Sequence, residues 1–147
     1  ALGIKAELER LEAADFIPDV VIIDYADNLA PVDKREETRD RVNTTWKHLR
    51  AIALERRVLL ATATQVNAAG FKAKWIDRTH FSEDNRKLNQ VSGLIGINAN
   101  DEERRRGICR LKWVVKRRGH PAPPVWIAQC LPLANPAVKS CFSAKRE

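Results

Sequence analysis

Three segments of this chain carry residue types that could act on phosphate groups. Asp24 directly follows the apolar run "VVII", and Gln65 follows "VLLATAT". Lys116 and Arg118 stand two apart in "VVKRRGH", which we predict to be the end of a strand. A carboxylate can hold a hydrated Mg²⁺, an amide can contact a terminal phosphate, and lysine and arginine can bind a phosphate as a point charge and a planar fork. Taken singly, each also has an ordinary structural interpretation, as a turn-forming acid, an amide bonded to local backbone, or charges at a sheet edge.

The elements that would position Asp24 and Gln65 follow from the hydrophobic pattern. Residues 20–24 and 58–63 are apolar enough to predict two strands buried on both faces, as in a parallel sheet. Between them, "DKRE" at residues 33–36 has the capping-box pattern, so a long helix should run to about residue 56. Its apolar stripe would be Val42, Trp46, Leu49 and Ala53. Such a βαβ unit would place Asp24 and Gln65 side by side at the carboxyl edge of the sheet.

The rest of the chain reads as shorter elements. Before the first strand, residues 4–11 have the spacing of a short amphipathic helix. After the second strand comes a long polar loop, residues 68–86, and then a third short strand at 94–98. Residues 101–106 form a charged turn or short helix. Residues 108–116 and 125–129 predict a β-hairpin on the sheet edge, and residues 131–147 a loosely held tail.

The long loop mixes cations with aromatic side chains. Lys72, Lys74 and Arg78 alternate with Phe71, Trp75 and Phe81. Aromatic platforms beside cations suit single-stranded nucleic acid, so Lys72, Lys74, Trp75 and Arg78 are candidate nucleic-acid-binding residues. The alternative is that Trp75 and Phe81 simply pin the loop to the core.

Composition narrows the function classes. The 147 residues carry a net charge of +7, which favours polyanionic partners. No apolar run approaches a membrane span, and the N-terminus lacks a signal-peptide pattern, so we expect a soluble, cytoplasmic protein. The three cysteines have no CxxC spacing, which fits idle thiols in a reducing compartment. The chain has no Met, which suggests a processed or recombinant protein or an excised piece of a longer one.

The order of these segments resembles a known family. "PDVVIIDYADNL", "LLATATQVN", "VSGLIGINANDEE" and "RLKWVVKRRG" are similar to the C-terminal part of the ATPase domain of DnaB-type replicative helicases, within the RecA-like superfamily. The resemblance covers about residues 18–129. It implies an α/β fold with a mostly parallel sheet flanked by helices and a C-terminal antiparallel β-hairpin. Residues 1–147 would then be one partial RecA-like domain, with its core at about 15–130.

The resemblance also implies roles for individual residues. Asp24 resembles the Walker B acid that orders Mg²⁺, and Gln65 the residue that links the γ-phosphate to the DNA-binding loop. Arg118 resembles the arginine finger that reaches a neighbouring subunit's ATP, and Lys116 its companion. The intact protein would then be a homo-oligomeric ring with ATP and Mg²⁺ between subunits. It would couple ATP hydrolysis to translocation on single-stranded DNA, in DNA replication.

The chain departs from the family pattern in ways that leave alternatives open. No GxxxxGK[ST] occurs in it, so the P-loop is absent from these residues. Relatives usually carry an apolar side chain and a glutamine where this chain has Ala26 and Asp27. We therefore expect neither hydrolysis nor tight binding of ATP or Mg²⁺ by this chain alone. It is either an excised C-terminal piece or a degenerate relative that works as a non-enzymatic nucleic-acid or partner-binding module. An unrelated receiver-like or flavodoxin-like domain fits the long loop and terminal hairpin poorly.

Overall fold

The computed structural model describes residues 2–30, 38–81, 85–120, 122–128 and 141–143. The chain divides into two compact units. The first consists of Ala1–Gln65 and Glu83–Gln90, and the second of Val66–Ser82 and Val91–Glu147. The expectation of one partial domain stays a prediction. No helix within these described ranges has both the length and the apolarity that crossing a membrane requires.

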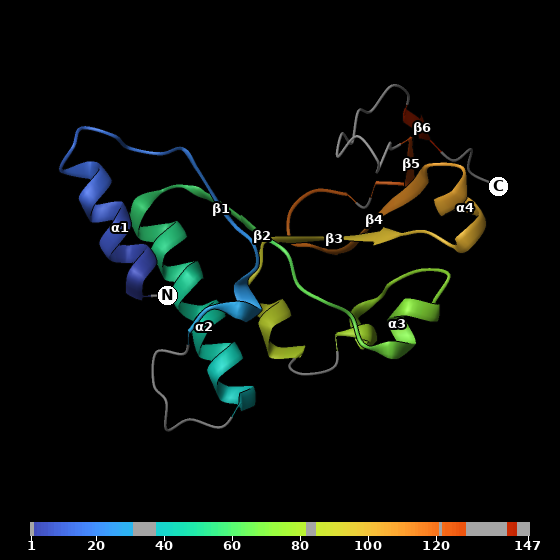
Figure 1. Ribbon diagram of the computed structural model, residues 1–147, viewed down its shortest axis with the longest axis horizontal. Helices are drawn as coiled ribbons and strands as arrows, with labels where there is room; N and C mark the ends of the chain where they lie inside the picture. The colour runs from blue at the N-terminus through green and yellow to red at the C-terminus, as the bar shows by residue number, and fades with distance from the viewer. Residues whose placement is uncertain (1, 31–37, 82–84, 121, 129–140, 144–147) are drawn as a thin grey trace. The chain divides into compact units, whose positions relative to one another are not determined.

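The first unit is built on the expected βαβ arrangement (Figure 1). It contains α1 (Leu2–Glu12), β1 (Val20–Ile23), α2 (Thr38–Arg56) and β2 (Leu59–Thr62), with the 3-10 helices η1 (Ala26–Asn28) and η3 (Asn85–Asn89). β1 and β2 pair in parallel with Val20 opposite Leu59 and Ile23 opposite Thr62. The capping box expected at residues 33–36 lies outside the described residues.

The core of the first unit sits on one face of α2. Trp46, Leu49 and Ile52 are buried there. The first two belong to the predicted stripe, and its other two members are half-buried. The prediction that both strands are buried on both faces is wrong, because exposure alternates along each strand, and Ile22 for example is 77% exposed. In the described residues this sheet has only two strands, so one face of its apolar run stays uncovered.

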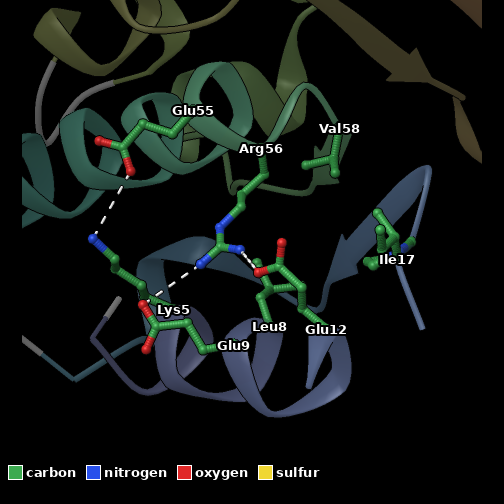
Figure 2. A pocket seen from close by; sticks show the side chains of 9 residues that line it. Lys5, Leu8, Glu9, Glu12, Ile17, Glu55, Arg56 and Val58 are labelled. Carbon is green, nitrogen blue, oxygen red and sulfur yellow. Dashed lines mark hydrogen bonds and ion pairs between the residues drawn. The ribbon is translucent and has the colours of Figure 1, made fainter. Parts of the chain in front are cut away.

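Charged side chains join α1 to α2 (Figure 2). The Arg56 guanidinium donates to the Glu12 carboxylate and lies 3.5 Å from that of Glu9, while the Lys5 ammonium lies 3.9 Å from the Glu55 carboxylate. These groups line a hollow of about 420 Å³. Since the charges already pair with one another across it, the hollow is a helix–helix contact.

The second unit is an antiparallel sheet rather than a continuation of a parallel one. β3 (Gly93–Asn98), β4 (Ile108–Lys116), β5 (Val125–Ala128) and β6 (Cys141–Ser143) are ordered β3-β4-β5-β6, and every pairing is antiparallel. The predicted β4–β5 hairpin is confirmed. The prediction of a mostly parallel sheet is wrong for the described residues, because β3 pairs with β4 instead of extending the β1–β2 sheet. Of the predicted loose tail only β6 is described.

The segment predicted to be a loop contains short helices. α3 (Ala68–Lys72) begins after Asn67, whose side chain accepts from the Gly70 amide, and η2 (Arg78–His80) begins after Asp77. An asparagine N-cap before two alanines is the signal that could have predicted α3. The charged turn at 101–106 is the short helix α4 (Asp101–Arg105), capped by Asn100.

A buried charge pair holds α4 against the sheet. Arg110, only 5% exposed, donates to the Glu103 carboxylate at 2.9 Å, and its guanidinium lies 4.5 Å from the centre of the Trp75 ring. Next to it in the sequence, Cys109 is a buried free thiol. Burial raises the pKa of this thiol, and the Glu103 charge raises it further.

The Glu103–Arg110 pair predicts a large cost for Glu103→Ala. Removing one partner leaves a buried charge unpaired, so the free energy of unfolding should fall by about 3 kcal/mol. Glu102→Ala is the matched control, because Glu102 is exposed and pairs with Arg106 at 3.7 Å. It should cost under about 1 kcal/mol. Urea unfolding checks both values, and equal losses would contradict the assignment.

Candidate functional site

The parallel pairing of β1 and β2 brings two chain segments to one sheet edge. Because Ile23 lies opposite Thr62, both strands end at the same level. The Thr62 hydroxyl donates to the Ile23 carbonyl at 2.8 Å and accepts from the Ala26 amide at 2.9 Å. This single side chain therefore fixes the path of the chain as it leaves β1.

Asp24, Tyr25 and Gln65 lie at this edge. The Gln65 amide nitrogen donates to the Tyr25 hydroxyl at 3.0 Å, which ties the residue after Asp24 to the end of β2. Asp24 is exposed, and its carboxylate has no partner among the described residues. The expected placement of Asp24 and Gln65 at the same edge is therefore found, and their chemical roles stay predictions.

Asp27 is the centre of a polar cluster just behind this edge. Its carboxylate accepts from the Trp46 indole N–H at 2.9 Å and from the Thr64 hydroxyl at 2.6 Å. The Lys87 ammonium lies 3.3 Å from the same carboxylate and donates to Thr64 Oγ1 at 2.7 Å. One carboxylate thus connects η1, α2, the end of β2 and η3, all within the first unit.

Lys87 makes this cluster energetically important. The residue is 3% exposed, so its charge is removed from water and must be paired. Its two oxygen partners, on Asp27 and Thr64, flank the segments that carry Asp24 and Gln65. The cluster therefore holds these two segments in a fixed relation.

Asp24 suits one mode of metal binding. In the described part of the chain no three His, Cys, Asp or Glu side chains gather as a metal cage. Mg²⁺ needs no such cage, since it keeps most of its waters and is commonly held by one or two carboxylates together with phosphates. An exposed carboxylate without a protein partner fits that role. A nucleotide fits less well, because the sequence offers no Gly-rich phosphate cradle.

Lys116 and Arg118 lie in the second unit. β4 ends at Lys116, so Arg118 stands in the following turn and the expectation that both project from one strand is wrong. The Lys116 ammonium donates to the His120 carbonyl at 2.5 Å and lies 5.5 Å from the centre of the Trp113 ring. Arg118 is exposed, has no partner in the described ranges, and precedes Gly119, whose φ of 80° permits the turn.

Arg117 anchors the same turn. Its amide donates to the Ser92 carbonyl at 3.1 Å, and its guanidinium donates to the Val91 carbonyl at 2.7 Å. The three consecutive cations therefore differ. Lys116 and Arg117 bind backbone carbonyls and hold the turn, whereas the Arg118 guanidinium reaches solvent without a partner among the residues described.

The predicted nucleic-acid-binding residues fall into two groups. Lys72, Lys74 and Arg78 are exposed. Trp75 is half-buried, flanked by Arg110 and by Lys112, whose ammonium lies 5.5 Å from the ring centre, with Trp126 edge-on at 6.2 Å. These contacts favour the interpretation that Trp75 pins the loop.

Sequence reasoning missed several residues of the site. Tyr25, Thr64 and Lys87 gain their importance from contacts between distant positions, and no local pattern marks them. Lys87 in particular lies in the polar run "SEDNRKLNQ", which indicates exposure. Asp27 was visible only as an acid that the family resemblance did not explain.

A double-mutant cycle on Asp27 and Lys87 tests the cluster. We expect Lys87→Met to lower the free energy of unfolding by about 3 kcal/mol, since it leaves Asp27 without its counter-charge. Asp27→Asn in the Lys87→Met background should cost clearly less than Asp27→Asn alone, with a coupling energy above about 1 kcal/mol. Lys47→Met is the matched control on an exposed lysine. Additive losses in urea unfolding would show that the two side chains do not interact.

Asp77 gives a prediction about pH. Hydrogen bonds from the Thr79 hydroxyl and then from the Thr79 amide lower the pKa of Asp77 from its ordinary 3.8. A carboxylate with a lowered pKa stabilises the fold above its ordinary pKa, and this contribution is lost as the pH falls through the lowered value. Protection of the Thr79 amide against hydrogen exchange should therefore fall below pH 3.8. Asp77→Asn should remove this pH dependence.

Comparison with known proteins rests on structure alone. No protein-family model matches the chain, and no curated protein matches it either. Among solved structures, the ATPase domain of a DnaB-like helicase superposes with a TM-score of 0.67 at 16% identity, over 74% of this chain and 40% of that one. "The Structure Of A DnaB-Like Replicative Helicase And Its Interactions With Primase" superposes with a TM-score of 0.75 at 14% identity, over 85% of this chain and 31% of that one.

These neighbours establish the fold. The chain spans less than half the length of either structure. At these identities, similarity carries the arrangement of elements and leaves the chemistry to the site. The chain has the RecA-like α/β fold found in the ATPase domains of DnaB-like replicative helicases.

Proposed function

We propose that this chain is the distal part of a DnaB-type helicase ATPase domain. The intact protein would hydrolyse ATP in a homo-oligomeric ring and translocate on single-stranded DNA in the cytoplasm. Asp24 would order Mg²⁺ through water, and Gln65 would link the terminal phosphate to the segment that follows it. Lys116 and Arg118 would act on the nucleotide of a neighbouring subunit. This chain alone would neither bind ATP tightly nor hydrolyse it.

The observation that carries the proposal is the bond between Gln65 and Tyr25. It holds an amide next to Asp24 at the carboxyl end of two parallel strands, where α/β folds bind ligands. Gln65 is also followed within three residues by α3, at the start of the basic loop. A change at the phosphate could therefore pass along a short path to the loop that would contact DNA.

The turn after β4 supports an arginine finger. A finger that acts on another subunit must be exposed and free of local partners, and yet be held firmly. Arg118 meets the first requirement within the described residues, and the anchoring of Lys116 and Arg117 meets the second. Arginine suits this task because its planar guanidinium can contact two phosphate oxygens at once.

A non-enzymatic binding module is the second candidate. It is favoured by the lack of a phosphate cradle in the sequence, together with the exposed cations Lys72 and Lys74. Such a module would bind single-stranded DNA with a marked salt dependence and hydrolyse no ATP, even within the intact protein.

Mixing two variants of the intact protein separates these candidates. Asp24→Asn and Arg118→Ala should each reduce ATP hydrolysis strongly, by about 10³-fold or more for the finger. If the two residues serve different subunits, mixed rings regain wild-type sites at about a quarter of their interfaces. Phosphate release should therefore reappear when the two variants are mixed before assembly.

Arg105→Ala is the control for loss of charge alone. Arg105 is an exposed arginine of the same unit, and its removal should leave hydrolysis within about twofold, because its charge is screened by solvent. No hydrolysis by the wild-type protein would favour the binding module. Wild-type hydrolysis with no recovery in the mixed rings would argue against a finger acting between subunits.

A further inference from the structure

Phe71 is a large aromatic side chain with no place in the core. It is 69% exposed at the end of α3 and makes no ring or cation contact within the described part of the chain. The other aromatic residues of this segment are engaged. Phe81 is buried, and the Trp75 ring is covered by Arg110 and Lys112.

The backbone under Phe71 is held firmly. Gly70 is buried, and a Cβ placed on it would lie 2.8 Å from Val66 Cβ and 2.9 Å from His80 Cβ. α3 can therefore pack against these side chains only because residue 70 is glycine. The Asn67 cap and the bond from the Asn67 amide to the His80 carbonyl, at 2.9 Å, close the segment on itself. Phe71 thus stands on a fixed platform.

Two cations accompany it. Lys72 follows directly and Lys74 comes two residues later, both exposed and both without an ion-pair partner in the residues the structure describes. Arg110 and Lys112, by contrast, lie over Trp75. An exposed ring beside two unpaired ammonium groups is the combination that binds a base and its adjoining phosphates.

We propose that Phe71 is the residue on which a base of single-stranded DNA stacks, with Lys72 and Lys74 binding neighbouring phosphates. The inference rests on the proposed DNA-binding function and assigns the stacking role to Phe71 in place of Trp75. Trp75 could stack a base only by giving up its contacts with Arg110 and Lys112, whereas Phe71 gives up none that the structure records.

The test compares two oligonucleotides of equal charge, a short oligo(dT) and an abasic strand of the same length. Wild-type protein should bind oligo(dT) more tightly, by about 5- to 150-fold, the range expected for one stacked base. Phe71→Ala should remove this preference and bind both strands with the wild-type affinity for the abasic one. Phe71→Leu should behave like Phe71→Ala, and Phe71→Trp should keep the preference. Fluorescence anisotropy measures all four proteins.

Two controls separate stacking from charge and from folding. Lys72→Ala should weaken binding of both strands and lower the slope of log affinity against log salt by about 0.7, without changing the preference. Circular dichroism should show Phe71→Ala to be folded, as expected for an exposed side chain.

The outcomes divide clearly. If the wild type prefers oligo(dT) and Phe71→Ala keeps that preference, the inference is overturned and DNA binding stands. Binding of both strands by the wild type without preference overturns stacking as well. If the wild type binds neither strand, the inference and the proposed DNA-binding function both fail.

Discussion

The candidate site depends on one buried positive charge. Lys87 is almost fully removed from water, and in the folded chain its counter-charge is Asp27. That carboxylate in turn binds the Trp46 indole and the Thr64 hydroxyl. A buried charge tolerates few alternative arrangements, so the ends of β1 and β2 are held where Tyr25 can meet Gln65. The geometry of the exposed edge is thus set from behind, by residues that no ligand would touch.

The sequence predicted well what local pattern controls. The βαβ unit, the helix at 101–105 and the antiparallel β4–β5 pair all follow from periodicity, capping and turn residues. Burial of both faces of β1 was wrong, because the apolarity of a strand does not say whether other strands or helices cover it. The parallel placement of β3 was wrong for a related reason, since a short apolar-rich segment fits either kind of pairing.

The site was predictable only in part. Asp24 and Gln65 could be placed together because parallel neighbours end at the same edge. Lys87 could not be placed there, since its contacts join positions 60 and 23 residues apart in the sequence. The shift of interest from Trp75 to Phe71 needed exposure, which the pattern of alternating cations and aromatic residues does not contain.

The Asp27–Lys87 pair also has a consequence for evolution. Helicase relatives usually carry a glutamine where this chain has Asp27, and a neutral amide cannot balance a buried ammonium. In those relatives the position of Lys87 should therefore hold a neutral side chain, or a lysine that reaches water. Either half of the pair changed alone would pass through a destabilised intermediate. The two positions should accordingly have been exchanged together, and a lineage that carries one of these charges should carry the other.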